Sequence, residues 1–335
     1  MVEARRAQRG ASKPTLASTL LAGALLLGAT ACSDDEPTSR PSATPSIDDG
    51  ERSPRPQKPE PEPSAPPLTA RFVAARGPQE LGARLARAED LARSRGTAAD
   101  VRAAAAFETQ LLYRQLARTP AWEDRVRAAV PPRYRADLDA HLTARRSLRS
   151  VLTTLSDEVP AWEILEPAPT AALLRFYREG ERAYGVPWEV LAAVNLVETG
   201  FGKIRGLSTA GAQGPMQFIP STWAAYGEGD INDPHDAILA AARYLAANGG
   251  DTEAGLENAL YRYNNHSGYV AGILAYASVL ERDPRALDVL VRWQIVYLST
   301  IGDLWLPIGY RETAPVPVRA YVREHPERHL GTATD

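Results

Sequence analysis

The sequence has little of several features that mark protein classes. Its 335 residues contain one cysteine, Cys32, which excludes an intramolecular disulfide. The five histidines are scattered along the chain without the spacing of zinc ligands. The uncharged apolar stretch over residues 16–31 is shorter than the roughly 20 residues that a transmembrane helix needs. Strand patterns are nearly absent, so we expect neither a disulfide scaffold nor a β-rich fold.

The N-terminus has the layout of an export signal. Four basic residues within the first thirteen precede the apolar stretch, and three small residues then precede Cys32. This order resembles a bacterial lipoprotein signal, in which the cysteine is lipidated and becomes the new N-terminus. We therefore expect residues 1–31 to be removed and the protein to be exported, anchored through Cys32 to the outer face of the cell membrane. The alternative is cleavage nearby by a general signal peptidase, with an incidental thiol.

The charge balance argues against a polyanionic partner. The whole chain has a formal net charge of −3, and residues 32–335 retain 34 basic against 40 acidic residues. A net charge of about −6 disfavours nucleic acid as a ligand.

Residues 32–70 lack apolar periodicity. Ten prolines lie between Pro37 and Pro67, among Ser, Thr, Glu and Arg. Such a segment cannot bury enough surface to offset the entropy lost on ordering. We expect a disordered tether that reaches at most roughly 120 Å.

The rest of the chain has helical periodicity, which predicts an all-α fold. Residues 71–160 form an expected helical subdomain without chemical motifs, and residues 161–310 a second helical domain. We predict helices over 78–95, 98–118, 121–129, 132–155, 168–184, 187–199, 219–226, 234–247, 252–262, 268–282 and 284–299. The apolar segment 302–310 either packs beneath a cleft or forms one of its walls, and the polar residues 311–335 are expected to be a frayed tail.

Glu198 is the first candidate catalytic residue. It continues a helical face that carries Leu191, Val194 and Asn195 and it stands just before a glycine-containing loop. Desolvation and the negative end of the helix dipole both disfavour its carboxylate form, which suits a general acid. A solvated glutamate at a helix end is the alternative.

Two loops accompany this glutamate. Residues 208–223, "STAGAQGPMQFIPSTW", are uncharged and rich in glycine and glutamine, and residues 261–270, "YRYNNHSGYV", bring tyrosines and asparagines. Glycines let backbone amides approach a ligand closely, and the polar tips suit a sugar cleft. A buried turn with Met216 and Phe218 as ordinary core is the alternative for the first loop, and surface tyrosines with an Asn-rich turn for the second.

In this order the motifs resemble the lytic murein transglycosylases with a lysozyme-like helical fold, closest to the membrane-bound type B branch. The resemblance covers about residues 160–310 and rests on "ETGFG", "GPMQF" and "YN" followed by "YV". It implies cleavage of the β-1,4 bond between N-acetylmuramic acid and N-acetylglucosamine in peptidoglycan, with formation of a 1,6-anhydro end. It also implies that Glu198 acts first as acid and then as base, without a second protein carboxylate.

The resemblance assigns further residues by position. The expected substrate-binding residues are Ser208, Gln213, Met216, Gln217, Tyr263, Asn264 and Tyr269. Ser208 would orient the glutamate or the substrate acetamide, Gln217 would contact sugar, and Tyr263 would hydrogen-bond the Glu198 carboxyl group. Asn265 and His266 depart from the family pattern, and we expect His266 to be an exposed loop residue.

The residues themselves bear on the single-glutamate mechanism. No Asp or Glu lies between Glu198 and Glu228, whereas ordinary glycosidases pair two carboxylates across the bond. The acidic stretch 227–236 lacks a calcium-loop pattern, and Asp233 suits a helix cap before Pro234. We therefore predict no required metal and no cofactor.

Three rival functions stay open. One is a hydrolytic muramidase acting on the same bond. Another is a non-catalytic peptidoglycan-binding or scaffold lipoprotein, which would have no need to keep Glu198. In the third, the 71–160 helices dock division or secretion proteins; the sequence identifies no protein partner.

Overall fold

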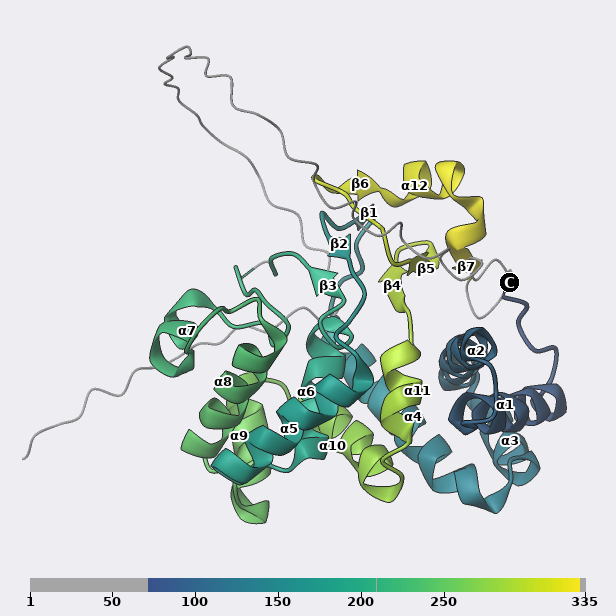
Figure 1. Cartoon of the computed structure of the whole chain (residues 1–335). Helices are drawn as coiled ribbons and strands as arrows, with labels where there is room; N and C mark the ends of the chain where they lie inside the picture. Colours follow the sequence, from purple (N-terminus) through teal and green to yellow (C-terminus); the bar gives the residue numbers. More distant parts are fainter. Residues whose placement is uncertain (1–71, 209, 332–335) are drawn as a thin grey trace, which may run out of the picture.

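The structure is a computed structural model that describes residues 72–208 and 210–331. The expected signal segment, Cys32 and the proline-rich tether lie outside these ranges. Over the described residues the fold is predominantly helical, which confirms the all-α prediction (Figure 1). The helices are α1 (Pro78–Arg93), α2 (Ala99–Arg118), α3 (Glu123–Ala129), α4 (Pro132–Val151), α5 (Thr170–Tyr184), α6 (Trp188–Thr199), α7 (Pro220–Tyr226), α8 (Pro234–Ala247), α9 (Glu253–Tyr263), α10 (Ser267–Arg282), α11 (Ala286–Arg292) and α12 (Val318–Glu324).

Local sequence sets several helix ends. Asp233 caps α8 by accepting hydrogen bonds from the backbone amides of His235 and Asp236, as predicted. Thr252 caps α9 in the same way through the amide of Gly255. Gly185 follows α5 in the left-handed conformation that glycine adopts without steric penalty.

Short strands accompany the helices. They are β1 (Glu158–Val159), β2 (Glu163–Ile164), β3 (Ile204–Arg205), β4 (Ile295–Ser299), β5 (Gly302–Leu306), β6 (Val316–Pro317) and β7 (His329–Gly331). The strands β4, β5 and β7 form an antiparallel sheet in which Ile295 pairs with Leu306 and Ser299 with Gly302. Two pairs, β1 with β6 and β2 with β3, complete the strand pairing of the described residues.

The structure corrects three predictions about the elements. The helix predicted over 284–299 is wrong, because α11 ends at Arg292 and residues 295–299 form β4. The helix predicted over 132–155 ends at Val151. Residues 311–331 are not frayed: they contain β6, α12 and β7, and Tyr321 is 1% exposed.

Two main cores organise the described residues. The larger is continuous from α1 to Trp293 after α11, so that Leu85 of α1 and Leu191 of α6 belong to the same cluster. The smaller surrounds the β-sheet and includes Tyr297, Leu304 and Tyr321. The 302–310 segment packs into this second core through Leu304, Leu306 and Tyr310.

Helix α4 joins the first helices to the rest of the fold. It packs along α10, where glycines allow close contact: a side chain at Gly272 would collide with Leu148, and one at Gly268 with the carbonyl oxygen of Ser147. In Figure 1, α1, α2 and α3 stand on one side of the molecule and α7, α8 and α9 on the other. Helices α5, α6 and α10 lie between these groups.

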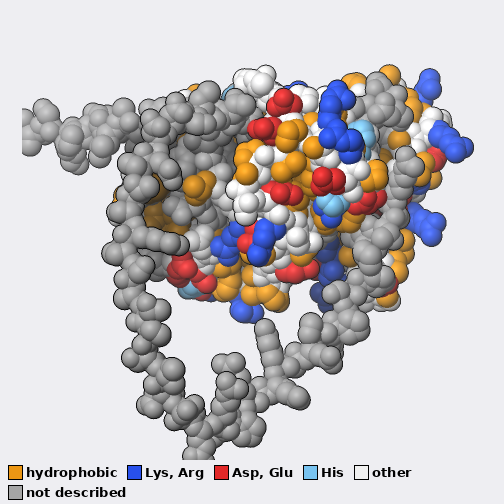
Figure 2. Space-filling model, turned by 90° about the horizontal axis from the view of Figure 1, so that it is seen from above, with side chains coloured by type: hydrophobic (Ala, Val, Ile, Leu, Met, Phe, Trp, Pro, Cys, Tyr) orange, Lys and Arg blue, Asp and Glu red, His pale blue; other side chains and the backbone are white. Residues whose placement is uncertain are grey.

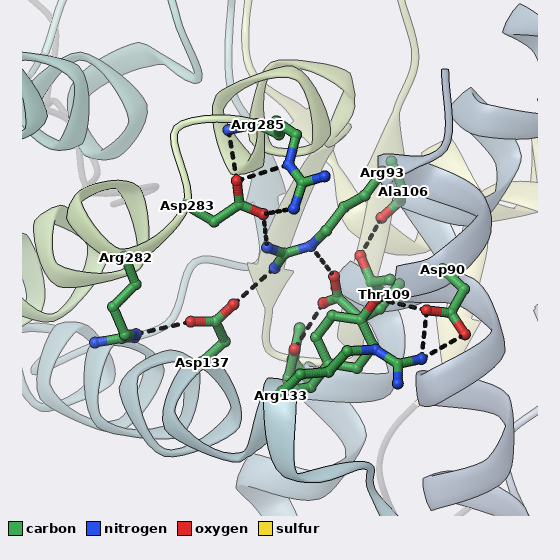
Figure 3. A network of polar contacts seen from close by, with 12 residues as sticks. Asp90, Arg93, Ala106, Thr109, Arg133, Asp137, Arg282, Asp283 and Arg285 are labelled. Atoms are coloured by element: carbon green, nitrogen blue, oxygen red, sulfur yellow. Dashed lines mark hydrogen bonds and ion pairs between the residues drawn. The ribbon is translucent and has the colours of Figure 1, made fainter. Parts of the chain in front are cut away.

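A buried ionic network reinforces this junction (Figure 3). The Arg93 guanidinium of α1 pairs with Glu89, with Asp137 of α4 and with Asp283 at the end of α10, at 2.8–2.9 Å. The side chain of Arg93 is 8% exposed and that of Asp137 5%. Because each charge has its partner, the network tolerates burial and links three helices that are distant in sequence.

None of the helices in the described ranges combines the length and apolar character needed to cross a lipid bilayer. Figure 2 shows acidic, basic and hydrophobic side chains intermingled over the coloured part of one face.

Candidate active site

Helix α6 places Glu198 at the point where the chain leaves the helix. Gly200 adopts a φ of +61° and its amide donates to the carbonyl oxygen of Leu196, while the amide of Phe201 donates to that of Asn195. Phe201 itself has a φ of +68°, which is uncommon outside glycine. The helix thus ends one residue after Glu198, in a sharp backbone turn.

The face predicted to continue into Glu198 is buried. Leu191, Val194 and Asn195 are each 0% exposed, and Glu198 is 1% exposed. The alternative of a solvated helix-end glutamate is therefore wrong.

One hydrogen bond holds the Glu198 carboxyl group. The Tyr269 hydroxyl of α10 donates to Oε1 at 2.7 Å, and Oε2 has no protein partner. Desolvation raises the pKa of Glu198 to about 8, and the Tyr269 hydrogen bond opposes that rise because it favours the carboxylate. No charged group of the described residues contributes to this shift. The group is therefore protonated at neutral pH.

Tyr263 takes a different role from the one predicted. Its hydroxyl donates to the backbone carbonyl oxygen of Met216 at 2.6 Å, not to Glu198. The Tyr263 and Tyr269 rings stack with centroids 6.4 Å apart and an interplanar angle of 5°. Because α10 lies against α6, Tyr269 of α10 reaches the Glu198 carboxyl group. Tyr263, at the end of α9, instead hydrogen-bonds to the loop that contains Met216.

Residues 213–218 form a tight hairpin beside the glutamate. The backbones of Gln213 and Phe218 exchange both hydrogen bonds at 3.0 Å, and Gln217 adopts a φ of +52° in the turn between them. Gly214 has a φ of +76°, and a side chain there would collide with the carbonyl oxygen of Ile231. The glycine and the strained glutamine fix the shape of this turn.

Buried polar groups of α6 clamp this hairpin to the helix. Asn195 Nδ2 and Thr199 Oγ1 donate to the carbonyl oxygen of Pro215, at 2.9 and 2.6 Å. Asn195 Oδ1 in turn accepts from the Tyr177 hydroxyl at 2.7 Å. Sequence reasoning missed this clamp, although a buried asparagine on an apolar helix face was a signal for it.

Two of the predicted binding residues, Met216 and Ser208, contribute to the core or to the loop itself. Met216 is 0% exposed and belongs to the main core, as does Phe218 at 3%, so the buried-turn alternative is correct for these two side chains. Ser208 is half-buried, and its hydroxyl accepts from the amides of Ala210 and Ala212. Its hydroxyl therefore stabilises its own loop, and no hydrogen bond to Glu198 forms.

Two predicted residues keep unpaired polar atoms. Gln217 is 6% exposed; its Nε2 donates to Gly214 while Oε1 has no partner. Asn264 is 1% exposed, and its Nδ2 has no partner. Buried polar atoms are normally hydrogen-bonded, so these two atoms and Glu198 Oε2 are suited to a polar ligand. Gln213 is half-buried in the same hairpin.

His266 is half-buried and caps α10 by accepting from the amide of Gly268 through Nδ1, at 2.9 Å. The expectation of an exposed loop residue is wrong, because the side chain is part of the helix start.

Lys203 is a further buried group that the sequence did not identify. It is 2% exposed, and its Nζ donates to the carbonyl oxygens of Gly200 and Val291, at 3.0 and 2.6 Å. Desolvation lowers the pKa of this lysine to about 7. It ties the end of α6 to the end of α11.

One acidic group resembles a metal site. Ligand atoms of Asp233, His235 and Asp236 lie within 4.8 Å of one another. Asp233 is occupied as the α8 cap, and Asp236 accepts from the amide of Asp230. The sequence-based prediction that no metal is required stays a prediction.

Comparison with known protein families gives one match. Residues 175–283 match the Transglycosylase SLT domain, a range that contains Glu198, the hairpin and the tyrosines described above. No curated protein and no solved structure matches the chain. This domain has a lysozyme-like fold, as expected, and supports peptidoglycan cleavage of the lytic transglycosylase type as the general function.

Proposed function

We propose that this protein is a lytic transglycosylase of the type B kind. It would cleave the β-1,4 bond between N-acetylmuramic acid and N-acetylglucosamine, with Glu198 as its acid and base. The observation that carries the proposal is the lone buried carboxyl group of Glu198, whose pKa is raised to about 8. Such a group is protonated before reaction and regains its proton easily afterwards.

The geometry at Glu198 supports a specific proton position. The Tyr269 hydroxyl donates to Oε1, so the carboxyl proton resides on Oε2, the atom without a protein partner. From there it transfers to the glycosidic oxygen as the bond from that oxygen to C1 of the muramic acid breaks. The Tyr269 hydrogen bond then stabilises the carboxylate.

The second half of the reaction returns the proton. The C6 hydroxyl of the same muramic acid attacks C1 and gives its proton to Glu198, so a 1,6-anhydro ring forms and no water is consumed. The substrate's own acetamide assists at C1. The unpaired Gln217 Oε1 and Asn264 Nδ2 provide an acceptor and a donor for sugar hydroxyl or acetamide groups.

The sequence favours this reaction over hydrolysis, because no Asp or Glu lies between Glu198 and Glu228. Glycosidases that use water pair an acid with a second carboxylate about 5–9.5 Å away. No acidic side chain of the described residues perturbs Glu198. A hydrolytic muramidase is therefore the weaker candidate.

Product analysis tests the proposal. The full-length protein, a Glu198→Gln variant and a Glu189→Gln control from the first turn of α6 would be incubated with peptidoglycan, and the fragments weighed by mass spectrometry. We expect anhydro-ended fragments from the wild type and the control, and none from Glu198→Gln. Reducing ends would make the protein a muramidase, and activity in Glu198→Gln equal to wild type would reject Glu198 as the acid.

We further propose export and lipid anchoring through Cys32, on the N-terminal pattern alone. Because Cys32 is the only cysteine, Cys32→Ser tests this cleanly. Fatty-acid labelling of the wild type and its loss in Cys32→Ser are expected; equal labelling, or a membrane fraction unchanged by the substitution, would contradict anchoring at this residue.

A further inference from the structure

A cavity lies against the opposite side of α6 from Glu198. Its volume is about 150 Å³, and Leu196, Val197 and Gly200 form the α6 part of its wall. Leu196 is rotated by about 160° around the helix axis from Glu198, and Gly200 follows the end of the helix. The rest of the wall comes from α2, α4, α10 and residues 290–298, so this cavity is distinct from the site at the hairpin.

The charge of this cavity is of one sign. Arg114, Arg145 and Arg149 line it, and no acidic side chain does. Arg114 is neutralised by a bidentate pair with Asp303, which is itself buried. Arg149 is exposed and donates to the carbonyl oxygen of Leu152. We call this space the arginine cavity.

Arg145 is the guanidinium without a counter-ion. Within residues 72–208 and 210–331 it forms no ion pair, and Asp303, the acidic group that acts on its pKa, is engaged by Arg114 and Arg118. Arg145 is half-buried and lines the cavity. Desolvation accordingly lowers its pKa to about 10. Tyr276, which also lines the cavity, hydrogen-bonds with Arg145 but carries no charge, so an anion in the cavity would supply the counter-ion that Arg145 lacks.

The remaining wall is apolar or already hydrogen-bonded. Leu148, Leu290 and Ile295 contribute aliphatic surface. Gln110 and Gln294 also line the cavity, but each satisfies the other: Gln110 Nε2 donates to the Gln294 carbonyl oxygen, and the Gln294 amide donates to Gln110 Oε1. One guanidinium without an ion pair, among mainly apolar walls, matches a monoanion that carries a short apolar group.

We propose that the arginine cavity binds a small aliphatic carboxylate, with the carboxylate on Arg145 and the aliphatic part against the leucine and isoleucine side chains. The planar guanidinium matches a carboxylate in a bidentate pair. The volume exceeds the roughly 30 Å³ that one water occupies, so several non-hydrogen atoms fit. A phosphate dianion would find too few donors.

Two sources supply this chemistry. The carboxylate is either a free small acid or the terminal carboxylate of a peptide carried by the glycan strand. The second source rests on the proposed function, whereas binding itself does not.

Calorimetric titration of the full-length protein with propionate and with propionamide tests the binding. Propionamide has nearly the same shape but no charge. We expect propionate to bind at least about tenfold more tightly than propionamide, because only the carboxylate forms charge-assisted hydrogen bonds with the guanidinium. Equal affinity for the two compounds, or binding of neither, would overturn the proposal.

Variants of two adjacent arginines assign the site. Arg145→Met should abolish propionate binding, whereas Arg146→Met should leave it unchanged, since Arg146 pairs with Glu123 away from the cavity. Arg145→Lys, which keeps the cation, should bind propionate weakly but more tightly than Arg145→Met. Thermal unfolding checks that each variant is folded; undiminished binding in folded Arg145→Met would refute the assignment.

Turnover then separates the sources. If the carboxylate belongs to the strand, Arg145→Met lowers kcat/KM about tenfold on peptide-bearing strands and leaves it unchanged on strands stripped of peptides. If it is a free acid, both strands respond alike. If the proposed function is wrong, the wild type and all variants will show no turnover, whereas the calorimetric result will be unaffected.

Discussion

The burial of Glu198 makes a quantitative prediction about stability and pH. In the unfolded chain this carboxyl group has its ordinary pKa of 4.5, and in the folded protein its pKa is raised to about 8. Between these values the folded state binds more protons than the unfolded state. Stability therefore falls as pH rises through this window. Glu198→Gln removes the titration while keeping the side chain's size.

The size of the effect follows from the two pKa values. The unfavourable contribution of Glu198 is about 0.8 kcal/mol at pH 5 and about 3.3 kcal/mol at pH 7. The stability of Glu198→Gln relative to wild type should therefore increase by up to about 2.5 kcal/mol between these pH values. Lys203, which is present in both proteins, cancels in the comparison.

Urea unfolding followed by circular dichroism at pH 5, 6 and 7 measures this difference. Glu257→Gln, which removes an exposed carboxyl group from α9, should change the unfolding free energy by less than about 0.5 kcal/mol at every pH. A wild-type-to-Glu198→Gln difference that does not vary with pH would refute the argument that Glu198 is buried in its protonated form.

Three further predictions concern neighbouring groups. Tyr269→Phe removes the hydrogen bond that favours the Glu198 carboxylate, so kcat should fall by about one to two orders of magnitude and the alkaline limb of the pH–rate profile should move to higher pH. Lys203→Met removes a buried group whose pKa is lowered to about 7. Above that pH the lysine is neutral in the folded wild type but still protonated in the unfolded chain. The unfolding free energy of the wild type, measured in urea titrations, should therefore rise relative to that of the variant by up to about 1.4 kcal/mol per pH unit. Arg93→Met leaves the buried carboxylate of Glu89 without an ion pair, while Asp137 keeps Arg282, and should lower the unfolding free energy by about 3–5 kcal/mol in the same assay.

Matched variants control these predictions. Tyr263→Phe removes a hydroxyl that does not reach Glu198, so it should leave the alkaline limb in place; a shift equal to that of Tyr269→Phe would contradict the assignment of the hydrogen bond. Arg133→Met breaks an exposed pair with Asp90 and should lower the unfolding free energy far less than Arg93→Met does. If Arg93→Met is as mild as Arg133→Met, the buried network does not join the helices.

Much of the fold follows from local sequence. Helix starts at Asp233 and Thr252 and the burial of the α6 face are set by capping chemistry and helical periodicity, which act over a few residues. The misassigned segment 295–299 reads "IVYLS", rich in β-branched and aromatic residues, and a two-residue turn joins it to β5. This composition favours a strand, but the helical periodicity of the preceding residues led to the prediction of one continuous helix.

The sequence predicts the catalytic candidate Glu198, but it does not predict which side chains contact it. The position of Glu198 follows from one helix. Whether Tyr263 or Tyr269 hydrogen-bonds to Glu198 depends on how α10 packs against α6. The burial of Lys203 between the ends of α6 and α11 depends on the position of α11. Such contacts join residues that are distant in sequence, so no local pattern specifies them.

The central claim is that Glu198 drives an internal attack without water. Digesting peptidoglycan with the full-length protein in water enriched in heavy oxygen tests it directly by mass spectrometry of the new ends. The account predicts anhydro ends that contain no solvent oxygen. Incorporation of one heavy oxygen atom at each new end would contradict it and identify a hydrolase.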